Sequence, residues 1–157
     1  MVLIMILIVI ALWGSLMSDS LLKVDLLCPD RAVWSGQASS LRAPGEGGSF
    51  GVLPRHIGLV AALGTGALSV EGPEGKRRFA VSGGFLEVKK EGSATRISVL
   101  SDSAEDAGEI DVTRAGASKK RAQERLASRT KDLDLPRAQA ALARALNRLR
   151  LAGPSPF

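Results

Sequence analysis

Short apolar segments alternate with polar breaks along the first two thirds of the chain. Between Leu21 and Asp102, runs rich in Val, Leu and Ile are separated by Gly, Pro and Asp at intervals of about eight to twelve residues, a rhythm typical of antiparallel β-structure. Glycine-containing clusters at 71–75, 82–84 and 91–93 indicate turns between them. The predicted strands are 22–27, 37–43, 59–63, 67–71, 78–82, 85–89 and 96–101.

The hydrophobic period changes after Ser103. Asp111 is a candidate N-cap for a helix running to about Ser128, and Asp134 is a candidate N-cap for a second helix, with Pro136 in its first turn and Gly153 after its end. Apolar residues spaced three and four apart predict one narrow seam along this second helix: Leu135, Ala138, Leu142, Ala145, Leu149 and Ala152. The short link between the helices requires them to fold back antiparallel.

These patterns predict an α+β fold, in which an N-terminal antiparallel β-sandwich is followed by a C-terminal antiparallel two-helix hairpin. We place the sandwich at residues 17–103 and the hairpin at 104–157. Residues 1–16 form an apolar leader that is short of the roughly 20 residues a spanning helix needs and lacks a preceding Lys or Arg. We interpret it as a start site assigned too early, with Met17 as the natural beginning; a membrane anchor is the alternative.

The charge of the chain is divided unevenly. Up to Glu109 there are ten Lys and Arg against twelve Asp and Glu, whereas the remainder has eleven against four, a local net charge of +7. Such a block suggests an acidic protein, a phosphate ligand, nucleic acid or a membrane surface as the partner. The single Cys28 cannot form an intramolecular disulfide, which favours a reducing compartment.

The positive block is organised into two arginine stripes. Arg114, Arg121 and Arg125 are seven and four residues apart on the first helix, and the second helix repeats that spacing with Arg137, Arg144 and Arg148. If the stripes converge, an anion between them would relieve the repulsion, and phosphate suits the planar guanidinium. Two solvated faces, or contact with an acidic protein, are the alternatives. Nucleic acid is disfavoured because no aromatic residue lies between Phe85 and Phe157 to stack on bases.

No arrangement of residues predicts catalysis. His56 is the only histidine and follows Pro54-Arg55 in a turn region, where a structural role is the simpler interpretation. No helix is predicted after Ser82-Gly83-Gly84, so that segment is a hairpin turn rather than a phosphate loop. The acidic residues Glu105, Asp106, Glu109 and Asp111 lie where a helix N-terminus favours negative charge.

Several segments together resemble one family, the epsilon subunit of the bacterial F-type ATP synthase. The resemblance runs from about Leu21 to Leu151. It is carried by GSFGVLPRH at 48–56, VSGGFLEV at 81–88, SVLSD at 98–102, IDVTRA at 110–115, RAQERL at 121–126 and RAQAALARALNRL at 137–149. It implies a non-catalytic central-stalk subunit that is peripheral at the cytoplasmic face of the bacterial membrane and meets the membrane only through the complex.

The resemblance also implies the partners and a regulatory ligand. The sandwich would contact the gamma subunit and the membrane rotor ring, and the helices would reach the catalytic beta and alpha subunits to inhibit ATP hydrolysis. No cofactor is required, no metal is implied and no nucleic-acid partner is expected, but some members bind ATP in the folded hairpin. Their ATP motif matches this chain at Glu105, Asp111, Arg114, Arg121, Arg144 and Arg148.

Two positions depart from the family pattern. Gly48-Ser49-Phe50-Gly51 stands where members often have Gly-Glu-Leu-Gly, and Pro54-Arg55-His56 stands where they have Pro-Gly-His. Ser49 thus lacks the carboxylate that the resemblance would place opposite the rotor ring, and Arg55 is a candidate contact with the polar loops of the ring instead. A stand-alone nucleotide or anion sensor without a rotary partner is the alternative function.

Overall fold

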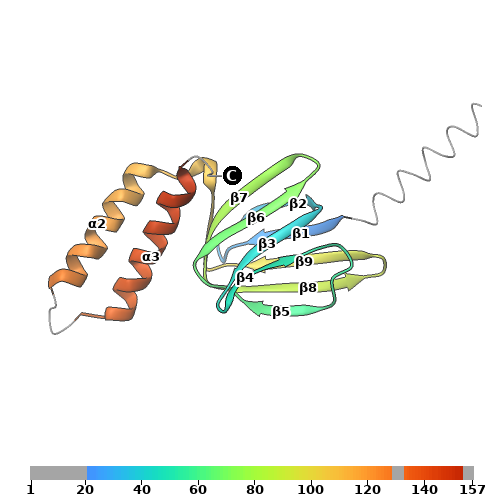
Figure 1. Ribbon diagram of the computed structural model, residues 1–157, viewed down its shortest axis with the longest axis horizontal. Coiled ribbons are helices and arrows are strands. Elements are labelled where there is room, and N and C mark those ends of the chain that lie inside the picture. Colours follow the sequence, from blue (N-terminus) through green and yellow to red (C-terminus); the bar gives the residue numbers. More distant parts are fainter. Residues whose placement is uncertain (1–20, 129–132, 154–157) are drawn as a thin grey trace, which may run out of the picture.

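A β-sandwich and a pair of α-helices lie side by side in the chain (Figure 1). The computed structural model describes residues 21–128 and 133–153, and the predicted leader at 1–16 lies outside them. In the described residues the strands precede both helices, so the α+β architecture of a sandwich followed by a hairpin is confirmed.

Each sheet of the sandwich has five strands. β1 lies parallel to β9, and the other neighbouring strands are antiparallel. In spatial order, the first sheet contains β2 (Ala32–Ala38), β1 (Leu22–Leu27), β9 (Ala94–Leu100), β8 (Phe85–Glu91) and β5 (Leu59–Ala62). The second contains β10 (Ser103–Asp106), β7 (Gly75–Ser82), β6 (Gly66–Gly72), β3 (Ser40–Gly45) and β4 (Gly48–Val52).

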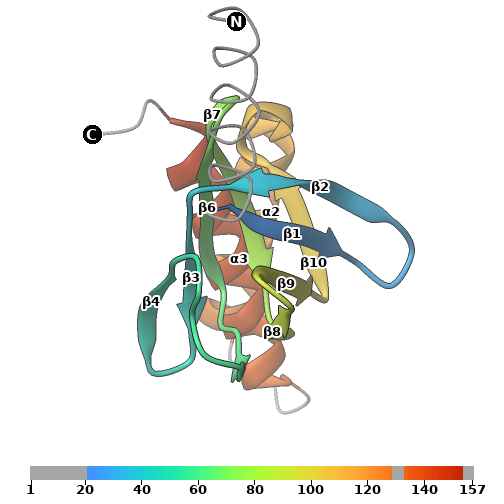
Figure 2. The ribbon, with the colours of Figure 1, turned by 90° about the vertical axis from the view of Figure 1, so that its right-hand side faces the viewer.

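The main hydrophobic core lies between the two sheets. Alternation along each strand sends apolar side chains inward, as in β9, where Ile97 and Val99 are buried while the alternate residues Arg96 and Ser98 are only partly covered. Figure 2 shows the strands from the end of the sandwich, with the helices behind. The largest fully buried side chains are Leu22, Leu26, Leu41, Leu68, Phe79, Leu86 and Ile97.

The sequence missed three strands. The predicted strand 37–43 is divided between β2 and β3, and most of β2 lies before it. β4 contains Gly48 and Gly51, and β10 consists of small and acidic residues, so neither has the Val and Ile content on which the prediction relied. The predicted division at residue 103 falls on the first residue of β10, which pairs with β7.

The two helices begin where the sequence predicted. A short 3₁₀ turn, η1 (Ala107–Glu109), leads into α2 (Val112–Ser128), and α3 (Leu135–Ala152) follows. The Asp111 Oδ1 accepts from the Arg114 N–H at 2.9 Å, and the Asp134 Oδ1 accepts from the Arg137 N–H at 3.0 Å. Both aspartates are therefore N-caps, which confirms the two predicted helix starts.

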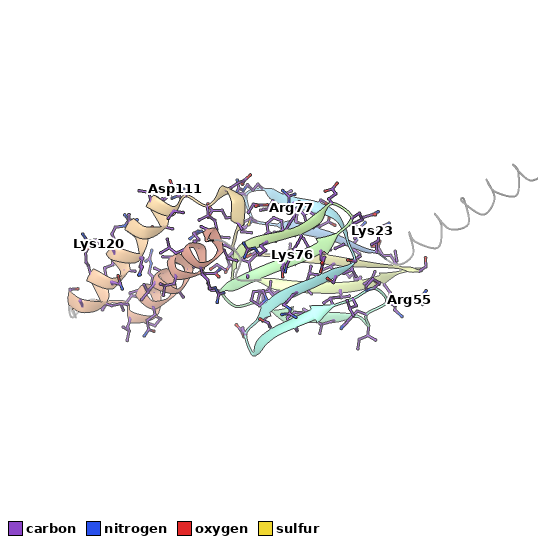
Figure 3. All side chains as sticks on the ribbon, turned by 45° about the horizontal axis from the view of Figure 1, so that its top comes forward. Lys23, Arg55, Lys76, Arg77, Asp111 and Lys120 are labelled. Atoms are coloured by element: carbon purple, nitrogen blue, oxygen red, sulfur yellow. The ribbon has the colours of Figure 1, made fainter. Side chains whose placement is uncertain are left out.

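The loop between β4 and β5 holds a residue with positive φ that is not glycine. Arg55 has φ 66°, and its backbone N–H donates to the buried Thr95 Oγ1 at 3.0 Å. The His56 N–H donates to the Leu53 carbonyl at 3.1 Å, so the predicted turn region around this histidine is a closed turn. Figure 3 shows Arg55 at the end of the sandwich away from the helices.

Candidate functional site: an arginine-lined cleft in the helical hairpin

Small residues allow the two helices to approach closely. Ala115 and Ala122 are the buried residues of α2, and the opposing helix α3 likewise buries Ala138 and Ala145. Because alanine has no side chain beyond Cβ, the longer side chains beside these alanines extend past them. They enclose a cleft of about 270 Å³ lined by Ser118, Arg121, Ala122, Arg125, Ala138, Ala141, Arg144, Ala145 and Arg148.

Four guanidinium groups gather around this cleft, two from each helix. Among the ion pairs of the described residues, only Arg148 of these four has a carboxylate partner, with its Nε 2.7 Å from the Glu105 Oε2. The Arg121 guanidinium donates to the Ser118 Oγ at 2.9 Å. Like charges around one cleft repel one another, whereas a bound anion would attract every guanidinium group that lines it. Four of the six stripe arginines therefore line one shared cleft.

A second hollow lies where the hairpin meets the sandwich. It has a volume of about 430 Å³ and is lined by Cys28, Pro29, Asp30, Arg31, Asp102, Ser103, Ala104, Glu105, Arg114 and Arg148. Arg148 borders both this junction hollow and the interhelical cleft. Burial raises the pKa of the Cys28 thiol above its ordinary value, so this cysteine stays protonated at neutral pH.

The six residues of the ATP motif occupy three places in the structure. Arg121, Arg144 and Arg148 line the interhelical cleft. Glu105 of β10 and Arg114 of α2 line the junction hollow together with Arg148, which pairs with Glu105. Asp111 lines neither space, because its carboxylate caps α2, as its position at the start of that helix in Figure 3 illustrates. Arg125 lines the cleft although it is outside the motif, while Arg137 of the predicted stripe borders neither space.

The predicted apolar seam of α3 is only partly correct. Ala138 and Ala145 are buried, but Leu135 at the start of the helix is 48% exposed. The helix instead has two packing faces, since Leu151 and Asn147, one turn apart, are buried against the sandwich. A single-seam prediction assumed one partner for α3, whereas the structure places this helix between α2 and the strands β6 and β7 (Figure 1).

The contact between the hairpin and the sandwich is small. Its buried apolar residues are Ala80 of β7, Ile110 and Leu151, with Ala67, Ala107 and Ala152 packed around them. Two polar contacts accompany this cluster: the Arg148–Glu105 ion pair, and a hydrogen bond in which the Asn147 Nδ2 donates to the Gly66 carbonyl at 2.8 Å. Sequence reasoning missed Asn147, whose only signal was an amide between two arginines on a helix with many alanines.

The described residues show two further features of the chain. No helix among them is both long and apolar enough to cross a membrane. No cluster of three or more His, Cys, Asp or Glu side chains within residues 21–128 and 133–153 is arranged to hold a metal ion. Ser82-Gly83-Gly84 is a turn between β7 and β8, with φ 70° and 101° at the two glycines, but these strands belong to different sheets. The predicted hairpin turn is therefore wrong: the turn carries the chain from one sheet to the other.

Comparisons with known proteins agree with this two-part layout. The model of the ATP synthase delta/epsilon chain beta-sandwich domain matches residues 21–107, and the model of the long alpha-helix domain of the same chains matches residues 109–153. A solved structure of the Euglena gracilis mitochondrial ATP synthase (OSCP/F1/c-ring) contains a chain with a TM-score of 0.67 and 22% identity. The match covers 79% of this chain and 76% of that one, and it supports the fold alone.

Curated bacterial proteins are more similar in sequence. The ATP synthase epsilon chain of Desulforamulus reducens is 44% identical over 130 residues, covering 83% of this chain and 96% of that protein. The epsilon chain of Bacillus velezensis is 42% identical over 131 residues, with coverage of 83% and 96%. The epsilon chain of Pelotomaculum thermopropionicum is 45% identical, covering 87% and 99%. The chain therefore belongs to the ATP synthase delta/epsilon family and is, within it, an epsilon chain of the bacterial type.

Proposed function

We propose that this chain couples the rotor of the ATP synthase to its catalytic head and brakes ATP hydrolysis through a hairpin that responds to ATP. The observation that carries the proposal is an arginine-lined cleft within a hairpin that is held to the sandwich by a small contact. The chain itself carries out no chemistry in this proposal, and it requires no cofactor.

The small contact supports a hairpin that can leave the sandwich. Ile110 and Leu151 are its only buried apolar side chains larger than alanine in the described residues, and each contributes about 1.5–3 kcal/mol when fully buried. The Arg148–Glu105 pair is partly exposed, with 31% and 25% of the side chains accessible, so solvent screens most of its energy. Docked and extended states can therefore lie within a few kcal/mol of each other, close enough for a ligand to shift their populations.

The arginine cleft supports a polyphosphate as that ligand. A guanidinium group can donate two parallel hydrogen bonds to phosphate oxygens. Both helices contribute guanidinium groups to this cleft. A polyphosphate bound between them joins α2 to α3 and so favours the folded hairpin. We assign ATP to this cleft, with Arg121, Arg144 and Arg148 as phosphate ligands, Glu105 and Arg114 at the neighbouring junction hollow, and Asp111 holding the start of α2.

The charge of the extended hairpin supports the braking step. The net charge of +7 on residues 110–157, which contain both helices, favours approach to an acidic segment of the catalytic beta and alpha subunits, and such steering weakens with salt. The sandwich remains on the gamma subunit and the membrane rotor ring, which keeps the chain peripheral at the cytoplasmic face of the membrane. Ser49 lacks the carboxylate that often stands at that position in the family, and Arg55, at the end of the sandwich away from the hairpin (Figure 3), would offer the ring a cation instead.

Removal of the hairpin from the assembled enzyme tests the brake. The deletion should remove residues 112–157 and keep β10, because that strand pairs with β7. We expect the enzyme to hydrolyse ATP severalfold faster at low ATP concentration, with unchanged subunit content on a native gel. Hydrolysis equal to that of the complete enzyme, with the truncated chain present, would contradict the brake.

Arg144→Ala tests the ATP response, with Arg137→Ala as its matched control. Both variants remove one arginine from α3, but only Arg144 lines the cleft. Calorimetric titration of the isolated chain should show at least tenfold weaker ATP binding for Arg144→Ala, because a bidentate charged contact contributes about 1.5–3 kcal/mol. Arg137→Ala should bind ATP as the parent does. Equal affinity in all three proteins would remove the cleft as the ATP site.

A further inference from the structure

Asn147 is a buried amide in the contact between the hairpin and the sandwich. Its side chain is 7% exposed, and its Nδ2 donates to the Gly66 carbonyl of β6 at 2.8 Å. Its Oδ1 accepts from the Arg150 guanidinium at 3.3 Å. Both ends of the amide therefore have partners, one across the contact and one on α3 itself. Burying an amide costs free energy unless its polar atoms form hydrogen bonds. Because Asn147 reaches the Gly66 carbonyl only when the hairpin is docked, this hydrogen bond is specific to the docked state.

The rest of the contact does little to fix the position of α3. Its apolar surface consists mainly of alanine side chains, which are short and can slide over one another. A hydrogen bond is directional and fails when the donor moves by an ångström or more. Its acceptor is on a rigid part of the sheet, since Gly66 is paired with Val81 and a Cβ on Gly66 would lie 2.5 Å from the Pro44 Cβ. The bond to Gly66 thus sets the register of docking.

The same bond fixes how the cleft arginines project. Arg144 and Arg148 flank Asn147 in sequence at spacings of three and one, so the rotation of α3 that satisfies Asn147 also determines where these two side chains point. In this orientation Arg148 reaches Glu105 on β10 while still lining the interhelical cleft. Docking on the sheet and the geometry of the cleft are therefore linked through a single turn of helix.

We propose that Asn147 is the positioning residue that couples polyphosphate binding in the arginine cleft to docking of the hairpin on β6. The inference rests on the proposed function for the ligand but concerns a residue outside the ATP motif. In the undocked hairpin Arg148 loses Glu105, and the cleft loses its fixed geometry. The apparent Kd for ATP then rises by the inverse of the docked fraction, so that a docked fraction of about one tenth weakens binding about tenfold.

Two substitutions of Asn147 distinguish the loss of its hydrogen-bond donor from the addition of a charge. Asn147→Asp keeps the shape of the side chain and removes the donor to Gly66, whereas Asn147→Leu removes the donor without adding charge. Gln139→Glu is the matched control, because it makes the same amide-to-carboxylate change at an exposed position of α3.

The position of the hairpin is measured in the full chain as the distance between two spin labels. The labels are attached to Cys residues introduced at Glu74, on the β6–β7 turn, and at Ala143, on α3, both of which are exposed. The native Cys28 is replaced by Ser in every variant.

We expect a single short distance for the parent and for Gln139→Glu, and a second, longer distance for both Asn147 variants with unchanged helix content. Saturating ATP should restore the short distance in Asn147→Leu, and its apparent Kd should rise several- to tenfold. Distances and affinities equal to those of Gln139→Glu would overturn the inference, and so would a long distance that ATP fails to shorten. Neither result bears on the hydrolysis measured after hairpin deletion, so failure of this inference and failure of the brake are distinguishable.

Discussion

Arg55 occupies a conformation that ordinary side chains avoid. With φ 66° it lies in the left-handed region, which costs an L-residue with a Cβ about 1–2 kcal/mol. Arg55→Gly removes that strain but adds about 0.5–1 kcal/mol of backbone entropy to the unfolded chain. We expect a net stabilisation of up to about 1 kcal/mol, measured by denaturant unfolding.

Arg55→Ala is the control for this prediction. Alanine keeps the Cβ and hence the strain, and it removes only the exposed part of the side chain. Its unfolding free energy should remain close to that of the parent. If the Ala and Gly variants are equally stable, the backbone at residue 55 is unstrained and the prediction is wrong.

Individual residues were predictable from the sequence where the cause is local. The capping carboxylates of Asp111 and Asp134 act on N–H groups three residues away, and the glycines of the 82–84 turn supply the positive φ that their positions require. Asn147 was not predictable, because its partner Gly66 is 81 residues distant and a helical amide between two arginines has no distinctive pattern. Caps and turns depend on residues that are close in sequence and can be predicted from it, whereas a docking contact depends on residues that only the assembled fold brings together.

At the scale of elements, the boundaries of both helices were predictable and some strands were not. Capping residues and proline define helix ends within one turn, so the α2 and α3 starts agree with the sequence. β4 and β10 are edge strands, and each pairs with one neighbour in its sheet. Such strands need less apolar surface, which explains why a search for Val and Ile runs overlooked them. The predicted seam of α3 failed similarly, since periodicity shows that a helix has an apolar face but not how many partners share it.

Asp111 belongs to the ATP motif, yet the structure gives its carboxylate a role at the start of α2. Asparagine caps helices about as well as aspartate, whereas alanine costs about 1 kcal/mol. Asp111→Asn should therefore keep both the helix content by circular dichroism and an ATP affinity within about twofold of the parent. Asp111→Ala should lower both. A loss of affinity in Asp111→Asn as large as that in Asp111→Ala would indicate that the carboxylate itself contacts the ligand.

At the scale of the whole molecule, charge and core are separated. The sandwich holds the large core between its sheets, while the hairpin carries the excess positive charge and only a minor hydrophobic cluster against the sandwich. The sequence revealed this separation, because the hydrophobic period changes after Ser103 and the excess of positive charge begins after Glu109. It could not reveal which face of the sheet the hairpin covers, since that depends on the packing of Leu151 and Asn147 on β6 and β7.

The separation predicts that the two parts unfold in separate steps. Regions with few buried apolar contacts open first, so the helical signal at 222 nm should be lost at a lower temperature than the signal of the sheets. ATP at about 100 times its Kd stabilises the form that binds it by about 2.7 kcal/mol, and this form is the folded hairpin. The first transition should therefore move to higher temperature with ATP while the second stays in place. In Arg144→Ala the same ATP concentration should move the first transition much less. A single cooperative transition, or an equal shift of both, would mean that the hairpin and the sandwich form one folding unit, and a hairpin so tightly joined could not leave the sheet to act as a brake.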